Sequence, residues 1–109
     1  MDEPEACEPR LGVIILAWPD TLVMSGDVGF AAVRGFGAVD RLDGVHLVDL
    51  SAATYLDTSA VGLLLRCVQL TRQRDPTRRV QVLGSSERVR ASLQMRGVEH
   101  LVDFVDLEE

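Results

Sequence analysis

The chain has 109 residues, which allows one domain and little more. Its apolar share of 47% is ample for a core, but only 5% of the residues are aromatic, so the core must be aliphatic. With 17 acidic and 11 basic residues the net charge is −6, which argues against nucleic acid as the main partner because phosphate binding needs a basic face.

The two ends of the chain are acidic. Residues 1–10 carry two prolines, so we expect a disordered acidic segment there rather than a signal peptide, which needs a basic start and an apolar stretch. We expect a single folded domain over residues 11–105, followed by an acidic tail at residues 106–109. No apolar run approaches the roughly 20 residues of a spanning helix. The sequence therefore predicts a soluble, cytoplasmic protein without membrane insertion.

The two cysteines indicate neither a disulfide framework nor a metal site. Cys7 and Cys67 lie far apart in the chain, with no Cys-x-x-Cys pattern and no histidine nearby. This usage fits a reduced cytosol. Cys67 stands in an apolar run, so we expect it to be a buried small hydrophobic residue.

The first half of the chain predicts a hairpin followed by a helix. Gly12 to Trp18 is rich in β-branched residues, Pro19-Asp20 is a turn signal, and Thr21 to Met24 is expected to return as a second strand. The apolar spacing from Asp27 to Leu42 favours a helix, which Ser25 or Asp27 could cap. Three glycines oppose this helix, so it either packs very closely against a neighbour or is shorter than the pattern indicates: Gly29, Gly35 and Gly37.

The second half alternates strands and helices. We expect strands at Val45–Leu50, Val80–Leu83 and Leu101–Val105, a helix from Ser59 to Arg74, and another that opens at Gly84-Ser85-Ser86-Glu87 and runs to about Met95 or Arg96. A serine caps the later helix, and Gly97 supplies the left-handed residue at its end. A hairpin followed by alternating helices and strands predicts an α/β fold with a mixed sheet that is largely parallel.

Most catalytic sites are excluded by missing residues. The chain has no phosphate-binding glycine loop, no dinucleotide fingerprint and no motif that would activate a serine. Its basic residues are all arginine, so the lysine of a phosphoaspartate receiver is absent as well. Asp49 and Asp57 are a candidate carboxylate pair whose separation the sequence leaves open. We therefore expect no enzyme, no catalytic residue, no metal and no cofactor.

Asp57-Thr58-Ser59 is a polar break directly before the most apolar stretch of the chain. Thr58 or Ser59 could accept a hydrogen bond from an unpaired amide at the helix start, and Asp57 would favour the positive end of the helix dipole. The cap accounts for one hydroxyl and the carboxylate, but it does not require both hydroxyls. The same position also suits a phosphoserine, because free amides and the dipole stabilise a phosphate.

The segment VHLVDLSAATYLDTSAVGLLL resembles the signature of the STAS domain family, especially its anti-sigma factor antagonists. In that family, Asp-Leu-Ser at a strand end is followed by Asp-Ser-Ser-Gly-Leu-Gly or Asp-Thr-Ser-Gly-Leu-Gly at a helix start. The later VQVLGSSERVRASLQMRGVEHLVDF is similar to the family's closing strand, helix and strand. The resemblance covers residues 12–105 and is weaker in the first half. It implies a STAS-like mixed β-sheet with an N-terminal β-hairpin and about three helices packed mainly on one side.

The resemblance also implies a phosphorylation switch. The accepting serine of the family motif corresponds to Ser59, with Thr58 as the less favoured acceptor. The unphosphorylated protein would bind an anti-sigma factor with serine kinase activity and so release a sigma factor, and a phosphatase would reset it. The partner-binding face would comprise Asp27, Asp57, Thr58, Ser59, Ala60 and Gly62.

Two positions depart from the family pattern and leave an alternative open. Ala60 replaces the usual glycine after the serine, and Gly29 stands where an upstream aspartate is expected. Other STAS proteins are never phosphorylated and serve as subunits or scaffolds of membrane transport or signalling complexes. In that alternative, the helix from Ser59 to Arg74 would be buried against a transporter subunit.

Five arginines cluster around the end of the same helix. They could complement the negative end of its dipole and aid solubility, or they could form a surface for an anionic partner. They are Arg66, Arg72, Arg74, Arg78 and Arg79.

Overall fold

This computed structural model describes residues 12–17, 20–37 and 39–105. The described part forms a sheet in the order β1-β2-β3-β4-β5, in which β1 and β2 are antiparallel and all later neighbours are parallel. The strands are β1 (Val13–Ala17), β2 (Thr21–Val28), β3 (Leu47–Leu56), β4 (Val80–Leu83) and β5 (Val102–Val105). This is the mixed sheet with an N-terminal hairpin that the sequence predicted. The expected disordered segment, Cys7 and the acidic tail lie outside the described residues.

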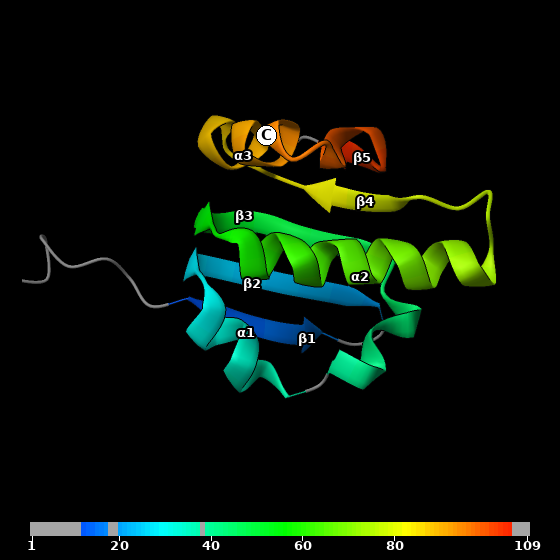
Figure 1. Cartoon of the computed structure of the whole chain (residues 1–109), viewed down its shortest axis with the longest axis horizontal. Coiled ribbons are helices and arrows are strands. Elements are labelled where there is room, and N and C mark those ends of the chain that lie inside the picture. The colour runs from blue at the N-terminus through cyan, green and yellow to red at the C-terminus, as the bar shows by residue number, and fades with distance from the viewer. Residues whose placement is uncertain (1–11, 18–19, 38, 106–109) are drawn as a thin grey trace, which may run out of the picture.

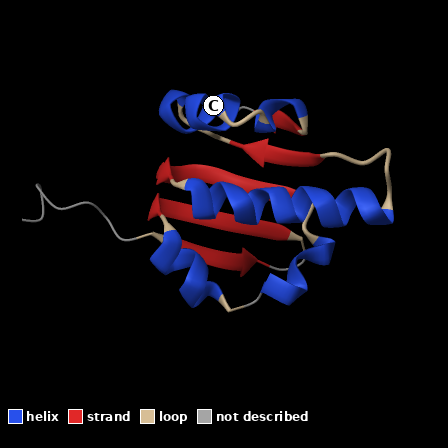
Figure 2. Cartoon of the chain, in the orientation of Figure 1, coloured by secondary structure: helices blue, strands red, loops and turns tan. Residues whose placement is uncertain are grey.

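Three helices and two 3-10 turns complete the described part of the chain. The helices are α1 (Phe30–Phe36), α2 (Thr58–Arg74) and α3 (Glu87–Met95), and the turns are η2 (Val39–Gly44) and η3 (Val98–His100). Figure 1 shows α1 and α2 on the same side of the sheet, with the long helix α2 running along β2 and β3. Figure 2 shows the same layering, with helices in front of strands.

The core lies between the sheet and the helices and is aliphatic, as the composition requires. Side chains alternate along β2, and Leu22, Met24 and Val28 point into the core. They meet the apolar stripe of α2, where Leu64 and Cys67 are fully buried. Burial raises the pKa of the Cys67 thiol to about 12, so this residue serves packing rather than reactivity.

The predicted helix from Asp27 to Leu42 is wrong in its bounds. Asp27 and Val28 belong to β2, where they pair in parallel with the end of β3, so neither Ser25 nor Asp27 caps a helix. The helix α1 covers only seven residues and ends at Gly37, whose φ is +75°. The glycines therefore mark a short helix and not a long, closely packed one.

The later elements follow the prediction more closely. β3 is longer than expected, because register shifts against β2 accommodate extra residues and carry the strand on to Leu56. The strand β4 has the predicted bounds, and α2 begins one residue earlier than expected, at Thr58. The Ser86 hydroxyl caps α3 by accepting a hydrogen bond from the Val89 amide at 3.2 Å, and Gly97 has the expected positive φ of 76°.

Candidate functional site

Asp57 caps the amino end of α2. It has an extended backbone, and its Oδ1 accepts a hydrogen bond from the Ala60 amide at 3.0 Å. Its main-chain carbonyl accepts the first helical bond from Val61, also at 3.0 Å. The expectation that Thr58 or Ser59 provides the cap is therefore wrong. A carboxylate one residue earlier reaches the amide and also suits the positive end of the helix dipole.

The same carboxylate holds the start of α1. Oδ2 of Asp57 accepts a hydrogen bond from the Phe30 amide at 3.1 Å, and the Asp57 amide donates to the Val28 carbonyl, also at 3.1 Å. This is possible because β2 and β3 are parallel and end at the same edge of the sheet. Asp57 thus ties the first turns of two helices together.

Gly29 allows this close approach. A Cβ atom at position 29 would lie 2.9 Å from Oδ2 of Asp57, closer than such atoms normally come. The backbone of Gly29 is extended, with φ of −133°, a conformation that any residue can adopt, so the glycine is not needed for its backbone angles. Glycine therefore replaces the aspartate of the family pattern at position 29 for a local reason. The Asp57 carboxylate occupies the space that a side chain would need there.

The two hydroxyls that follow Asp57 are not used by the fold. Within the described part of the chain, neither the Thr58 nor the Ser59 hydroxyl makes a hydrogen bond. Thr58 is exposed and Ser59 is half-buried. Both side chains therefore remain available for contact or modification while Asp57 does the capping.

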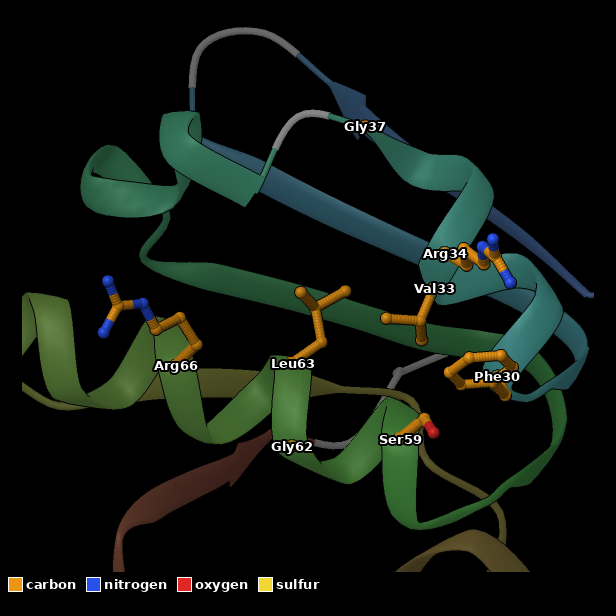
Figure 3. A pocket seen from close by; sticks show the side chains of 8 residues that line it. All are labelled: Phe30, Val33, Arg34, Gly37, Ser59, Gly62, Leu63 and Arg66. Carbon is orange, nitrogen blue, oxygen red and sulfur yellow. The ribbon is translucent and has the colours of Figure 1, made fainter.

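Ser59 borders a groove of about 940 Å³ between α1 and α2. Figure 3 shows the groove from close by, with Ser59 near Phe30 at one end and Arg66 farther along α2. Its centre is apolar, and two arginines stand on the two helices that form its sides. The lining residues are Phe30, Val33, Arg34, Gly37, Ser59, Gly62, Leu63 and Arg66. Such a groove offers apolar contact together with positive charge.

No family model and no curated protein matches the chain, whereas solved structures do. The anti-sigma factor antagonist SpoIIAA in its unphosphorylated form is 18% identical, with a TM-score of 0.60 over 90% of this chain and 89% of the other. A candidate anti-sigma factor antagonist from Thermotoga maritima, tm1081, is 10% identical, with a TM-score of 0.63 over 88% and 86%. The Bacillus cell fate determinant SpoIIAA in the phosphorylated form is 19% identical, with a TM-score of 0.59 over 90% and 92%.

The chain has the STAS fold. Each of these three structures covers 88–90% of this chain. At 10–19% identity the likeness concerns the fold. Function has to be argued from the residues that this chain places on the STAS fold.

The predicted partner-binding residues lie near the shared end of β2 and β3 but differ in their surroundings. Thr58, Ser59 and Gly62 follow one another on the first turns of α2, and the last two line the groove. Ala60 is fully buried, so its methyl group faces the core and does not stand beside the Ser59 hydroxyl at the surface. The Asp27 carboxylate accepts a hydrogen bond from the Thr54 hydroxyl and does not line the groove.

Sequence reasoning missed the half of this site that comes from α1. Phe30, Val33 and Arg34 join Ser59 only because parallel strands deliver both helices to one sheet edge. One signal was present: in open α/β sheets, ligands bind beyond the carboxyl ends of the strands. Phe30, a residue that is 61% exposed, comes just after such a strand end.

The candidate carboxylate pair does not form. Oδ1 of Asp49 accepts hydrogen bonds from the amide and hydroxyl of Ser51, at 2.9 and 2.6 Å, while Asp57 caps two helices. Among the described residues there is no group of three or more histidine, cysteine or acidic side chains that could hold a metal ion. None of the helices in these ranges is long and apolar enough to cross a membrane.

The structure separates Arg66 from the other four arginines of the predicted cluster, since Arg72, Arg78 and Arg79 line one pocket and Arg74 and Arg78 line another. Arg66 lines the groove, away from the helix end. Arg79 pairs with Asp103 at 2.8 Å and donates to the main-chain carbonyls of His100 and Val102, so it holds β5 against β4. Only Arg72 and Arg74 lie in the last turn of α2, where the dipole favours positive charge.

Proposed function

We propose that this chain is an anti-sigma factor antagonist that binds an anti-sigma factor with serine kinase activity while unphosphorylated. Phosphorylation of Ser59 switches that binding off, and a phosphatase restores it. The observation that carries the proposal is the unused Ser59 hydroxyl at the start of α2, where Asp57 already supplies the cap. The likeness in fold to SpoIIAA in its unphosphorylated and phosphorylated forms also supports this proposed function.

Ser59 suits phosphoryl transfer from a partner. In the step, Oγ of Ser59 forms a bond to the γ-phosphorus of ATP, the hydroxyl proton goes to a base on the kinase, and ADP leaves. The chain contributes only the hydroxyl and its placement, since the nucleotide and the base belong to the partner. The product carries about −1.5 to −2 charges at pH 7, at a helix end that favours negative charge.

The partner would distinguish the phosphorylated from the unphosphorylated protein through the surface around Ser59. Thr58 is exposed beside it, and Gly62 adds no side chain, so a partner can approach the first turns of α2 closely. Asp57 contributes by positioning these turns. Thr58 is the second candidate acceptor, because its hydroxyl is equally unused within the described residues.

The test has a mass measurement and a binding measurement. Protein purified from its native cell is digested, and a phosphoryl group is expected on the peptide that contains Ser59. Ser59→Ala should bind the kinase partner and resist inactivation by ATP, whereas Ser59→Asp should bind at least about tenfold more weakly, because it mimics the charge. Thr58→Ala is the matched control and should be phosphorylated like the wild type. Equal binding by both Ser59 variants would refute the switch.

The alternative role as a transporter subunit needs a surface other than the one the sequence indicated. The apolar stripe of α2 is buried in the chain's own core, including Leu64 and Cys67, and therefore cannot pack on a partner. Purification of a stable complex with transporter subunits that contains no phosphorylated form would favour that role.

A further inference from the structure

We propose that the groove between α1 and α2 receives an acidic segment of the partner protein, one that presents apolar side chains between its carboxylates. This inference extends the proposed function and rests on it for the identity of the partner. It concerns the region beside Ser59 and names the chemistry of the chain segment that docks there.

The charge of the groove differs from that of the protein as a whole. The chain has a net charge of −6, yet the groove lining contains two arginines and no acidic residue. Neither Arg34 nor Arg66 forms an ion pair within the described part of the chain, and Arg34 lies 6.0 Å from the centre of the Phe30 ring. Two uncompensated guanidinium groups on an acidic protein select carboxylates from a partner.

Apart from Ser59, the rest of the lining has no polar side chain, and its exposure ranges from the buried Leu63 to the largely exposed Phe30. Val33 and Leu63 form the apolar centre of the groove, and Phe30 lies at one end of it, near Ser59 (Figure 3). Phe30 is mostly exposed although it is a large aromatic residue, the kind of side chain that anchors protein interfaces. Five of the eight lining residues are exposed, so the groove would enclose a small ligand poorly: Phe30, Arg34, Gly37, Gly62 and Arg66. Its shape favours a segment of a protein over a small molecule.

The position of Ser59 couples this groove to the switch. Ser59 is part of the lining, so a phosphate on its hydroxyl adds nearly two negative charges to the same space. That charge offsets the two arginines and repels the carboxylates of an acidic segment. Phosphorylation therefore blocks docking through charge alone, without any need for a change of fold.

The test uses the full chain labelled with ¹⁵N and a short fluorescein-labelled peptide made of glutamate and leucine. We expect saturable binding, with amide shifts concentrated at Phe30, Val33, Gly62 and Leu63. Arg66→Glu should weaken binding about tenfold, because it replaces an attraction with a repulsion, and Ser59→Asp should weaken it in the same direction. Gly62→Leu should also weaken it, because the new side chain fills the groove and leaves its charge unchanged.

Matched controls separate a docking site from general attraction. Arg72→Glu makes the same charge change at an exposed position on the same helix, outside the groove, and should bind the peptide like the wild type. A lysine–leucine peptide and a glutamate–serine peptide should both bind poorly. Circular dichroism confirms that each variant is folded.

Several results would overturn the inference. Equal losses of peptide affinity in Arg72→Glu and Arg66→Glu would do so, as would amide shifts outside the groove. Tighter binding of decanoate than of the peptide would indicate a small ligand instead. Self-association of the chain in sedimentation would indicate a second copy as the occupant. The proposed function fails on different grounds, namely a Ser59 that no kinase modifies. Peptide binding in the groove would stand even then, and a phosphorylated Ser59 beside an inert groove would refute this inference alone.

Discussion

The helices that form the two sides of the groove are held in different ways. The longer one, α2, has 17 residues, seven buried side chains and its own carboxylate cap. The shorter one, α1, has seven residues, no fully buried side chain and no cap from its own N-cap residue, Gly29. Its first amide is bound instead by Asp57, at the start of the other helix.

This difference shows how one side of the site can be rigid and the other adjustable. Buried apolar area fixes α2 on the sheet, whereas α1 depends on partly buried Ala32, Val33 and Phe36 and on the hydrogen bond to Asp57. A partner that enters the groove therefore meets a fixed wall that carries Ser59 and a wall that can shift. We expect α1 to open at lower free energy than α2.

The largest expected effect comes from truncating a core side chain on each helix. Leu64 in α2 is fully buried, so Leu64→Ala should lower the free energy of unfolding by about 2–5 kcal/mol. Phe36 in α1 is only partly buried, and Phe36→Ala should cost less, about 1–2 kcal/mol, although more atoms are removed. Urea unfolding of both variants measures the difference. Equal losses would show that α1 is as firmly packed as α2.

The next effect breaks the link between the two helices. Asp57→Ala removes the cap of α2 and the acceptor of the Phe30 amide, so it should lower the free energy of unfolding by about 1–2 kcal/mol. Hydrogen exchange should accelerate in both α1 and the first turn of α2. Ser86→Ala, which removes the cap of α3 alone, is the control and should leave exchange in α1 unchanged. Unaltered exchange at Phe30 in Asp57→Ala would contradict the link.

A double-mutant cycle tests the reason given for Gly29. In the wild type, Gly29→Ala should destabilise, because its Cβ would lie 2.9 Å from Oδ2 of Asp57. In the Asp57→Ala background that oxygen is gone, and the same change should be neutral or stabilising, since the extended backbone accepts alanine. We expect a coupling free energy of about 0.5 kcal/mol or more from urea unfolding. Additive effects would remove this explanation of the glycine.

The contrast between the helices also explains what the sequence could predict. The apolar stripe of α2, the serine before α3 and Gly97 are local signals, and the structure has the elements they predicted. In the region from Asp27 to Leu42 the local signals conflict, because the apolar spacing favours a long helix and the glycines favour a short one. There the pairing of β2 with β3 decides where the strand ends, and this contact between distant segments is invisible to local spacing.

In the candidate site, too, the sequence predicted the residues of a contiguous motif but not those that only the fold brings together. The sequence identified Asp57, Thr58 and Ser59 because they form one contiguous motif, although it assigned the cap to a hydroxyl instead of Asp57. It could not place Arg34 and Arg66 in one groove, because they come from two helices that only the fold brings together. It also placed Asp27 on the partner-binding face, which stays a prediction; the Asp27 carboxylate accepts a hydrogen bond from the Thr54 hydroxyl and does not line the groove.

The smallest expected effect compares one substitution made in both helices. An added Cβ at Gly35 in α1 or at Gly62 in α2 would meet no atom within 4 Å, so alanine fits at either position. Gly62→Ala should raise the free energy of unfolding by about 0.5–1 kcal/mol, the usual gain inside a helix. Gly35→Ala should raise it less, because a helix without fully buried side chains spends more time open, but it should slow hydrogen exchange within α1. If both variants gained equally in urea unfolding and exchange in α1 did not change, α1 would be as rigid as α2, and the groove would have two fixed walls.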